Sequence, residues 1–101
     1  MIRPAPLIVL GIALSTPVLA QNAPAQNAPP PGALACSGCH PPAPVAGILV
    51  PALNGKPATE IVTQMAAFAS GAQASTVMGR IAKGFNEDEV KAIAAWYAAQ
   101  K

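Results

Sequence analysis

The feature that most limits what this chain can fold into is a pair of cysteines followed directly by a histidine. Cys36, Cys39 and His40 lie in the run Cys-Ser-Gly-Cys-His, and the chain has no other cysteine and no other histidine. This C-x-x-C-H spacing is typical of c-type haem attachment. Two cysteines on one helical turn reach the same edge of a porphyrin, and the residue after them can bind iron on the axis. The motif therefore predicts one haem, covalently bound through Cys36 and Cys39 and ligated by His40.

Three other uses of the motif are less well supported. A thioredoxin-like dithiol belongs in a β-α-β setting, and no strand pattern precedes Cys36. A structural zinc site needs four ligands, and the chain offers two cysteines and one histidine. A disulfide between Cys36 and Cys39 would close a very small loop and stabilise the fold little.

The first third of the chain has the composition of an export signal and a linker. Residues 1–20 combine Arg3, a short apolar run over Leu7–Leu14 and small residues before position 21, which predicts a cleavable signal peptide. The apolar run is shorter than the roughly 20 residues that span a bilayer, so no membrane span is expected in the mature chain. Residues 21–32 repeat Gln-Asn-Ala-Pro and end in a proline run, which is typical of an extended linker.

The remaining residues, 33–101, form one domain that is short of large side chains. A core of roughly 70 residues is marginal without a staple, metal or cofactor. The chain is 52% hydrophobic but only 4% aromatic, and alanine makes up much of the apolar count. A haem would fill the middle of such a domain. The charge is low and forms no basic stripe, so nucleic-acid binding is not indicated.

The periodicity predicts an all-α fold with about three helices around the haem. A short helix is expected over residues 33–39, a second over 58–70 with Gly71 as its C-cap, and a third over 87–100. Asn86, with Glu89 three residues later, marks the start of the third helix as a capping box. Its apolar stripe consists of Val90, Ile93, Ala94 and Tyr97, with Trp96 beside it, either packed on the first helix or at the surface.

Met78 is the preferred second axial ligand. With one histidine in the chain, bis-histidine ligation is excluded, which leaves Met65, Met78 and a few lysines. Met65 shares an apolar helix face with Ile61 and Phe68, which indicates core packing. Met78 lies between glycine-rich stretches, and we expect it on a loop or short turn before the last helix.

Two residues after the motif are candidates for the haem pocket. Pro51 has no backbone donor, and its segment leaves carbonyls free to accept a hydrogen bond from His40. Leu53 would then pack against the haem face. An ordinary turn ending at Asn54 and Gly55 explains the same residues equally well.

Taken together, these features resemble class I cytochrome c over residues 33–101. That family has an N-terminal helix ending in C-x-x-C-H, a C-terminal helix crossing it, a loop methionine and a proline carbonyl that holds the axial histidine. Cys36, Cys39, His40, Pro51 and Met78 occur in the matching order. The resemblance implies a small class I cytochrome c fold with His40 and Met78 as iron ligands.

A narrower resemblance lies in the run Ala-Ser-Thr-Val-Met-Gly-Arg-Ile-Ala-Lys-Gly-Phe, which covers residues 74–85. It is similar to the methionine loop of the cytochrome subunit of flavocytochrome c sulfide dehydrogenase. That resemblance implies a periplasmic electron-transfer subunit that accepts electrons from a sulfide-oxidising flavoprotein and passes them to a downstream acceptor. Arg80, close to Met78, is a candidate contact for a haem propionate.

The chain is thus expected to transfer electrons and to have no catalytic residue of its own. The alternative is a free monohaem carrier between periplasmic dehydrogenases and a terminal acceptor. A haem sensor or peroxidase domain would need an open sixth coordination site, and a purely structural module would have to fold without haem.

Overall fold

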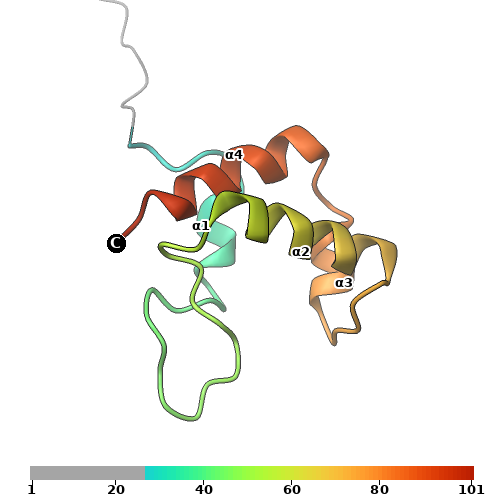
Figure 1. Cartoon of the computed structure of the whole chain (residues 1–101), viewed down its shortest axis with the longest axis horizontal. Coiled ribbons are helices and arrows are strands. Elements are labelled where there is room, and N and C mark those ends of the chain that lie inside the picture. Colours follow the sequence, from blue (N-terminus) through green and yellow to red (C-terminus); the bar gives the residue numbers. More distant parts are fainter. Residues whose placement is uncertain (1–26) are drawn as a thin grey trace, which may run out of the picture.

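The computed structural model describes residues 27–101, and the signal peptide predicted over residues 1–20 lies outside this range. The element order is α1 (Ala33–Cys36), α2 (Ala58–Ser70), α3 (Met78–Ala82) and α4 (Glu87–Ala98). The described residues contain no strand, which confirms the predicted all-α class. In Figure 1 the two longer helices, α2 and α4, lie next to each other, and α2 also packs against α3.

The two longer helices begin and end where local signals place them. α2 covers the predicted residues and ends at Gly71, which adopts the left-handed conformation with φ 80°. α4 begins after Asn86, whose side chain accepts a hydrogen bond from the Glu89 amide (2.9 Å), while the Glu89 carboxylate accepts one from the Asn86 amide (2.8 Å). This reciprocal capping box satisfies two backbone donors that the first helical turn leaves free.

Two predicted boundaries were wrong. The first helix ends at Cys36 instead of residue 39, because 3₁₀-type bonds replace the α-helical pattern there; the Gly38 and Cys39 amides each donate to a carbonyl three residues earlier. The last helix ends at Ala98, where the Ala99 amide is shared between the carbonyls of Ala95 and Trp96. Helix ends commonly fray in this way.

A helix that the sequence did not predict begins at Met78. The residue was expected on a loop or short turn, and it instead opens α3, a helix of 5 residues. The Gly79 amide donates to the Ser75 hydroxyl at 2.8 Å, which ties the start of α3 to the preceding turn. Ala82 of α3 is buried, so packing supplies the stability that this short, glycine-containing segment lacks on its own.

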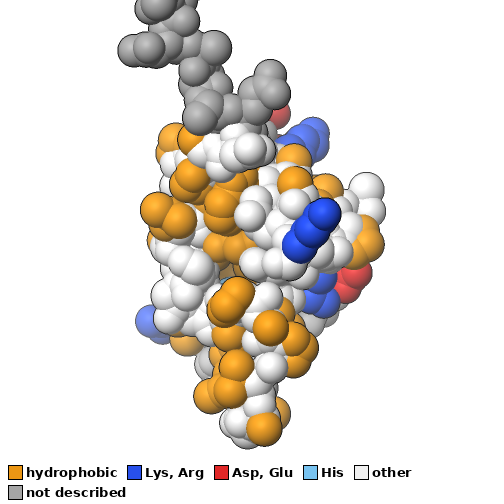
Figure 2. Space-filling model, turned by 90° about the vertical axis from the view of Figure 1, so that its left-hand side faces the viewer, with side chains coloured by type: hydrophobic (Ala, Val, Ile, Leu, Met, Phe, Trp, Pro, Cys, Tyr) orange, Lys and Arg blue, Asp and Glu red, His pale blue; other side chains and the backbone are white. Residues whose placement is uncertain are grey.

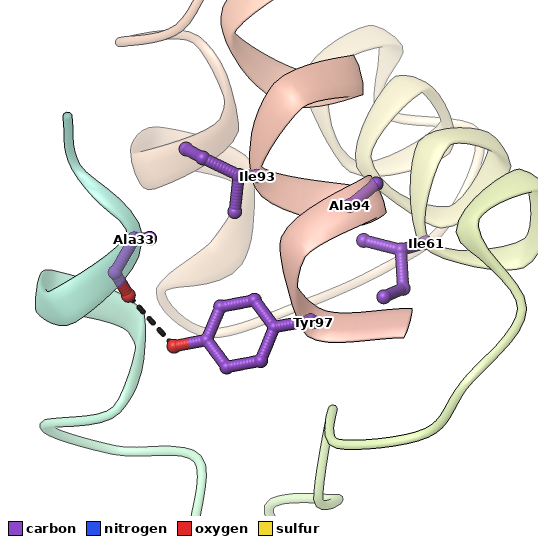
Figure 3. Close-up of a cluster of buried hydrophobic side chains, with 5 residues drawn as sticks. All are labelled: Ala33, Ile61, Ile93, Ala94 and Tyr97. Atoms are coloured by element: carbon purple, nitrogen blue, oxygen red, sulfur yellow. Dashed lines mark hydrogen bonds between the residues drawn. The ribbon is translucent and has the colours of Figure 1, made fainter. Parts of the chain in front are cut away.

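The core is small and joins α1, α2 and α4 (Figure 3). Its buried members are Ala33, Ile61, Ile93, Ala94 and Tyr97. Half-buried side chains pack around it, including Met65, as its helical spacing predicted, and Trp96, whose ring meets that of Tyr97 edge-on with centroids 4.9 Å apart. The indole nitrogen of Trp96 donates to the Asn27 carbonyl at 3.2 Å, so the described end of the predicted linker lies against α4.

A long loop connects α1 to α2 and forms the lower end of the molecule in Figures 1 and 2. Residues 42–51 are all exposed, and Leu49 is 98% exposed. No charged side chain occurs between Ala33 and Gly55. Figure 2 accordingly shows hydrophobic side chains over this end.

Candidate haem-attachment site

The cysteine–histidine motif continues α1 as a tight turn. The His40 amide donates to the Cys36 carbonyl at 2.9 Å, and the Cys39 amide donates to the same carbonyl at 3.2 Å. His40 therefore lies one helical turn beyond Cys36. Pro41 follows directly and cannot continue the helix, so the chain leaves the turn immediately after His40.

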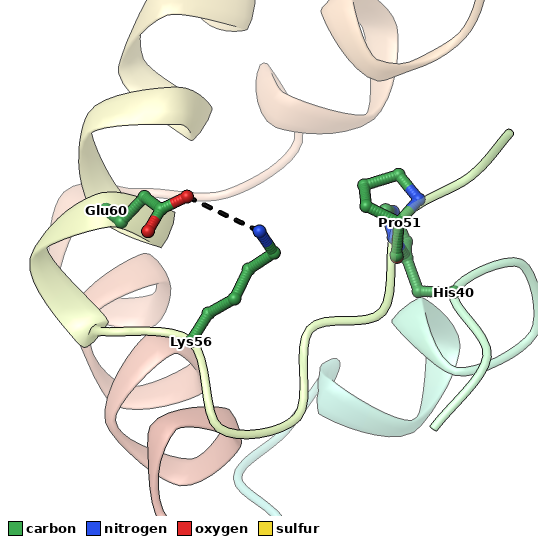
Figure 4. A network of polar contacts seen from close by, with 4 residues as sticks. All are labelled: His40, Pro51, Lys56 and Glu60. Carbon is green, nitrogen blue, oxygen red and sulfur yellow. Dashed lines mark hydrogen bonds and ion pairs between the residues drawn. The ribbon is translucent and has the colours of Figure 1, made fainter. Parts of the chain in front are cut away.

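The imidazole of His40 is held by the backbone of the long loop. Its Nδ1 atom lies 2.6 Å from the Pro51 carbonyl oxygen, and because a carbonyl only accepts, Nδ1 is the protonated donor. Figure 4 shows the two residues against each other, with His40 coming from the end of the motif and Pro51 from the loop. This contact fixes the tautomer and leaves Nε2 with its lone pair free to bind a metal.

The two cysteines are free thiols in different surroundings. Cys36 is half-buried, and its Sγ atom lies 3.7 Å from the Gly32 carbonyl oxygen, whereas Cys39 is exposed. Burial raises the pKa of the Cys36 thiol above its usual value, so this thiol is protonated at neutral pH. Neither thiol is part of a disulfide, and the single hydrogen-bond contact of Cys36 Sγ among the described residues is the one to the Gly32 carbonyl.

The other predicted site residues come from two separate segments. Leu53, on the same loop as Pro51, is half-buried and packs against the core. Met78 is half-buried at the start of α3, and Arg80, two residues later, is exposed and forms no ion pair among the described residues. The structure therefore brings His40 and Pro51 into direct contact and places Leu53 against the core, and it carries Met78 and Arg80 on α3 beneath α2 (Figure 1).

Two residues that support this site were not predicted. Ser75 holds the first turn of α3 through its hydroxyl, and a serine placed shortly before a helix is a local signal that could have revealed it. Tyr97 donates its hydroxyl to the Ala33 carbonyl at 2.6 Å across 64 positions of sequence. The sequence placed Tyr97 on an apolar stripe, but no local pattern shows where a buried hydroxyl finds its acceptor.

The donor set fits a covalently attached haem. Two free thiols and one imidazole with an available Nε2 match the motif chemistry. Exposed apolar side chains stand beside each predicted haem-contacting segment: Leu34, Val50, Val77 and Ile81. A large apolar group is what such side chains would cover. No group of three or more histidine, cysteine or acidic side chains converges among the described residues, so a structural zinc site lacks ligands there.

These features form a cysteine–histidine turn in a small helical domain, with the donor groups that haem attachment requires. The chain is similar to the cytochrome subunit of sulfide dehydrogenase from Chlorobaculum tepidum, with 38% identity over 64 residues. This confirms the resemblance seen in the sequence. The match covers 63% of this chain and 58% of the relative, so the chain spans little more than half of the relative's length.

No protein-family profile matches the chain, and no solved structure matches it either. Within residues 27–101, no helix is both long and apolar enough to cross a membrane.

Proposed function

We propose that this chain is an exported electron-transfer protein that carries one haem c. Cys36 and Cys39 would hold the haem covalently, and His40 would bind its iron through Nε2. The observation that supports this most directly is the 2.6 Å contact from His40 Nδ1 to the Pro51 carbonyl, because axial histidines characteristically donate their second ring nitrogen to an oxygen acceptor.

Met78 is the second ligand in this proposal. A thioether is a soft ligand that favours the reduced metal and raises the reduction potential. When bound, the haem would supply one-electron chemistry, and the protein would supply ligation, burial and a docking face. Leu53 would pack against the haem, and Arg80, exposed and unpaired among the described residues, is available to a propionate.

We further propose that the partner is a sulfide-oxidising flavoprotein in the periplasm. The name of the Chlorobaculum relative and the similarity of residues 74–85 to the methionine loop of such cytochrome subunits support this role. The chain then has no catalytic residue: sulfide would be oxidised on the partner, and the haem would take up the electrons one at a time. The predicted signal peptide over residues 1–20 supports export, which would bring the chain to the compartment where the haem is attached.

Purification of the native protein from the periplasm tests both the proposed haem electron transfer and the proposed flavoprotein partner. We expect a flavoprotein to co-elute with the haem absorbance and sulfide to reduce that haem. Dithionite, which needs no enzyme, serves as the control that the haem is redox-competent. A haem protein that elutes alone and is reduced by dithionite but not by sulfide is a free carrier, and the sulfide dehydrogenase assignment then fails. A Cys36→Ser, Cys39→Ser variant that still holds haem under denaturing conditions would refute attachment through these two cysteines.

A further inference from the structure

The contact between His40 and Pro51 joins the two ends of a loop that does not hold itself in place. Residues 42–51 are exposed throughout. Among backbone hydrogen bonds of the described chain, the loop between these two residues has only a local one, from the Ile48 amide to the Val45 carbonyl at 3.1 Å. The positions of the imidazole and of its acceptor must therefore be set from outside the loop.

Tyr97 forms one hydrogen bond to the segment before this loop and one to the segment after it. Its hydroxyl donates to the carbonyl of Ala33, the first residue of α1, at 2.6 Å, and its own carbonyl accepts from the Gly55 amide at 3.0 Å. Tyr97 is 3% exposed and Ala33 is fully buried, so water does not compete with the hydroxyl bond. Figure 3 shows the ring of Tyr97 pointing from α4 to α1.

A short hydrogen-bonded segment links each of these two hydrogen bonds of Tyr97 to the His40–Pro51 contact. On one side, α1 runs from Ala33 to Cys36, and the Cys36 carbonyl accepts from the His40 amide. On the other side, Gly55 follows Pro51 by four positions, and between them Leu53 packs against the core and accepts from the Lys56 amide at 3.1 Å. A shift of Tyr97 thus moves donor and acceptor relative to each other.

We propose that Tyr97 is a positioning residue that sets the length of the His40–Pro51 hydrogen bond and, through it, the reduction potential. This inference rests on the proposed ligation of haem iron by His40. A short bond from Nδ1 to a carbonyl makes the imidazole a more basic ligand, which stabilises the oxidised metal. Loss of the Tyr97 hydroxyl lets α1 and the loop drift apart, so the bond weakens and the potential rises.

The test compares holoprotein carrying Tyr97→Phe with holoprotein carrying Ile93→Val. Ile93 lies on the same helix and is buried in the same cluster. Its replacement by valine loosens the packing around α1 without removing a hydrogen bond. We expect Tyr97→Phe to raise the ratio of reduced to oxidised haem at a fixed ambient potential by about three- to tenfold, where tenfold corresponds to 59 mV for one electron. The Nδ1 proton of His40, followed by NMR, should exchange faster in Tyr97→Phe, and Ile93→Val should change neither quantity.

A second probe keeps the test decisive if Tyr97→Phe fails to fold. Tyr97 is the single tyrosine of the chain, so growth on 3-fluorotyrosine modifies this position alone. The more acidic phenol donates more strongly, and we expect a potential shift of opposite sign. An unchanged potential in both proteins, or equal shifts in Tyr97→Phe and Ile93→Val, would overturn the positioning role. The sulfide experiment is independent, because a free carrier would refute the partner and leave the Tyr97 result standing. A haem iron that His40 does not ligate would refute both the proposed ligation and the positioning role.

Discussion

Gly32 is the position where the structure makes the sharpest prediction about how α1 is seated. It precedes α1 with φ 87°, and a Cβ atom built there would lie 2.6 Å from Cε1 of Phe85 and 3.5 Å from Cδ1 of Ile93. A Gly32→Ala change therefore adds two costs. The left-handed backbone costs about 1–2 kcal/mol for a residue with a Cβ, and displacing the half-buried ring of Phe85 costs about 1–3 kcal/mol more.

Gly71 provides the matched control because it shares the backbone conformation but has no neighbour. Its φ is 80°, and a Cβ there would meet nothing within 4 Å. Gly71→Ala should therefore show the backbone cost alone. The difference between the variants should be about 1–3 kcal/mol, and in a domain of this size each kcal/mol lowers Tm by about 4–8 °C. Thermal unfolding of both holoproteins, followed by circular dichroism, measures it. Equal losses of Tm would refute the argument that close approach of Phe85 requires glycine at position 32.

Three further predictions concern the last helix and the iron ligand. Asn86→Ala should remove the capping box and lower the free energy of unfolding by about 1 kcal/mol, whereas Asn86→Ser should retain most of it; urea unfolding compares them. Burial raises the pKa of Tyr97, so the folded state binds that proton more tightly than the unfolded state. Its contribution to stability is complete below the unfolded pKa of about 10 and is lost as pH rises through the folded pKa. Urea midpoints should thus fall more steeply above pH 10 in the unmodified protein than in Tyr97→Phe, and parallel curves would contradict this. Met78→Ala should give a high-spin absorption spectrum and a lower potential, while Met65→Ala, a core substitution, should leave the ligand spectrum unchanged.

The parts of the fold that the sequence predicts are those with signals close in the chain. The start of α4 was predicted because both members of the capping box lie within four residues. The end of α2 was predicted because glycine, the residue at position 71, adopts a φ of 80° without strain. The turn that carries the cysteine–histidine motif was recognised for the same reason, since its thiols and imidazole are separated by short, fixed intervals. The sequence supported two roles for the Pro51 segment equally, an acceptor for His40 and an ordinary turn. The 2.6 Å contact between His40 Nδ1 and the Pro51 carbonyl oxygen favours the acceptor role.

The parts that the sequence does not predict depend on contacts between distant segments. α3 is too short to form from propensity alone. It is stabilised by the burial of Ala82 and by the hydrogen bond from the Gly79 amide to the Ser75 hydroxyl. The partner of the Tyr97 hydroxyl is 64 positions away, and only the tertiary fold shows it. A hydrogen bond between such distant residues leaves no periodic pattern in the sequence.

The same few residues build the core and hold the cysteine–histidine turn, so the proposed haem binding would be coupled to folding. The buried side chains of the described chain are Ala33, Ile61, Ala82, Ile93, Ala94 and Tyr97, and half of these are alanines. Each alanine removes little apolar surface from water, so the core alone contributes little stability. A haem between the turn and α3 would cover apolar side chains such as Val50, Val77 and Ile81 and so add the burial that the helices lack. Attachment at Cys36 and Cys39 would therefore complete the core as well as the redox site, and α1 would be ordered by the same event that positions His40.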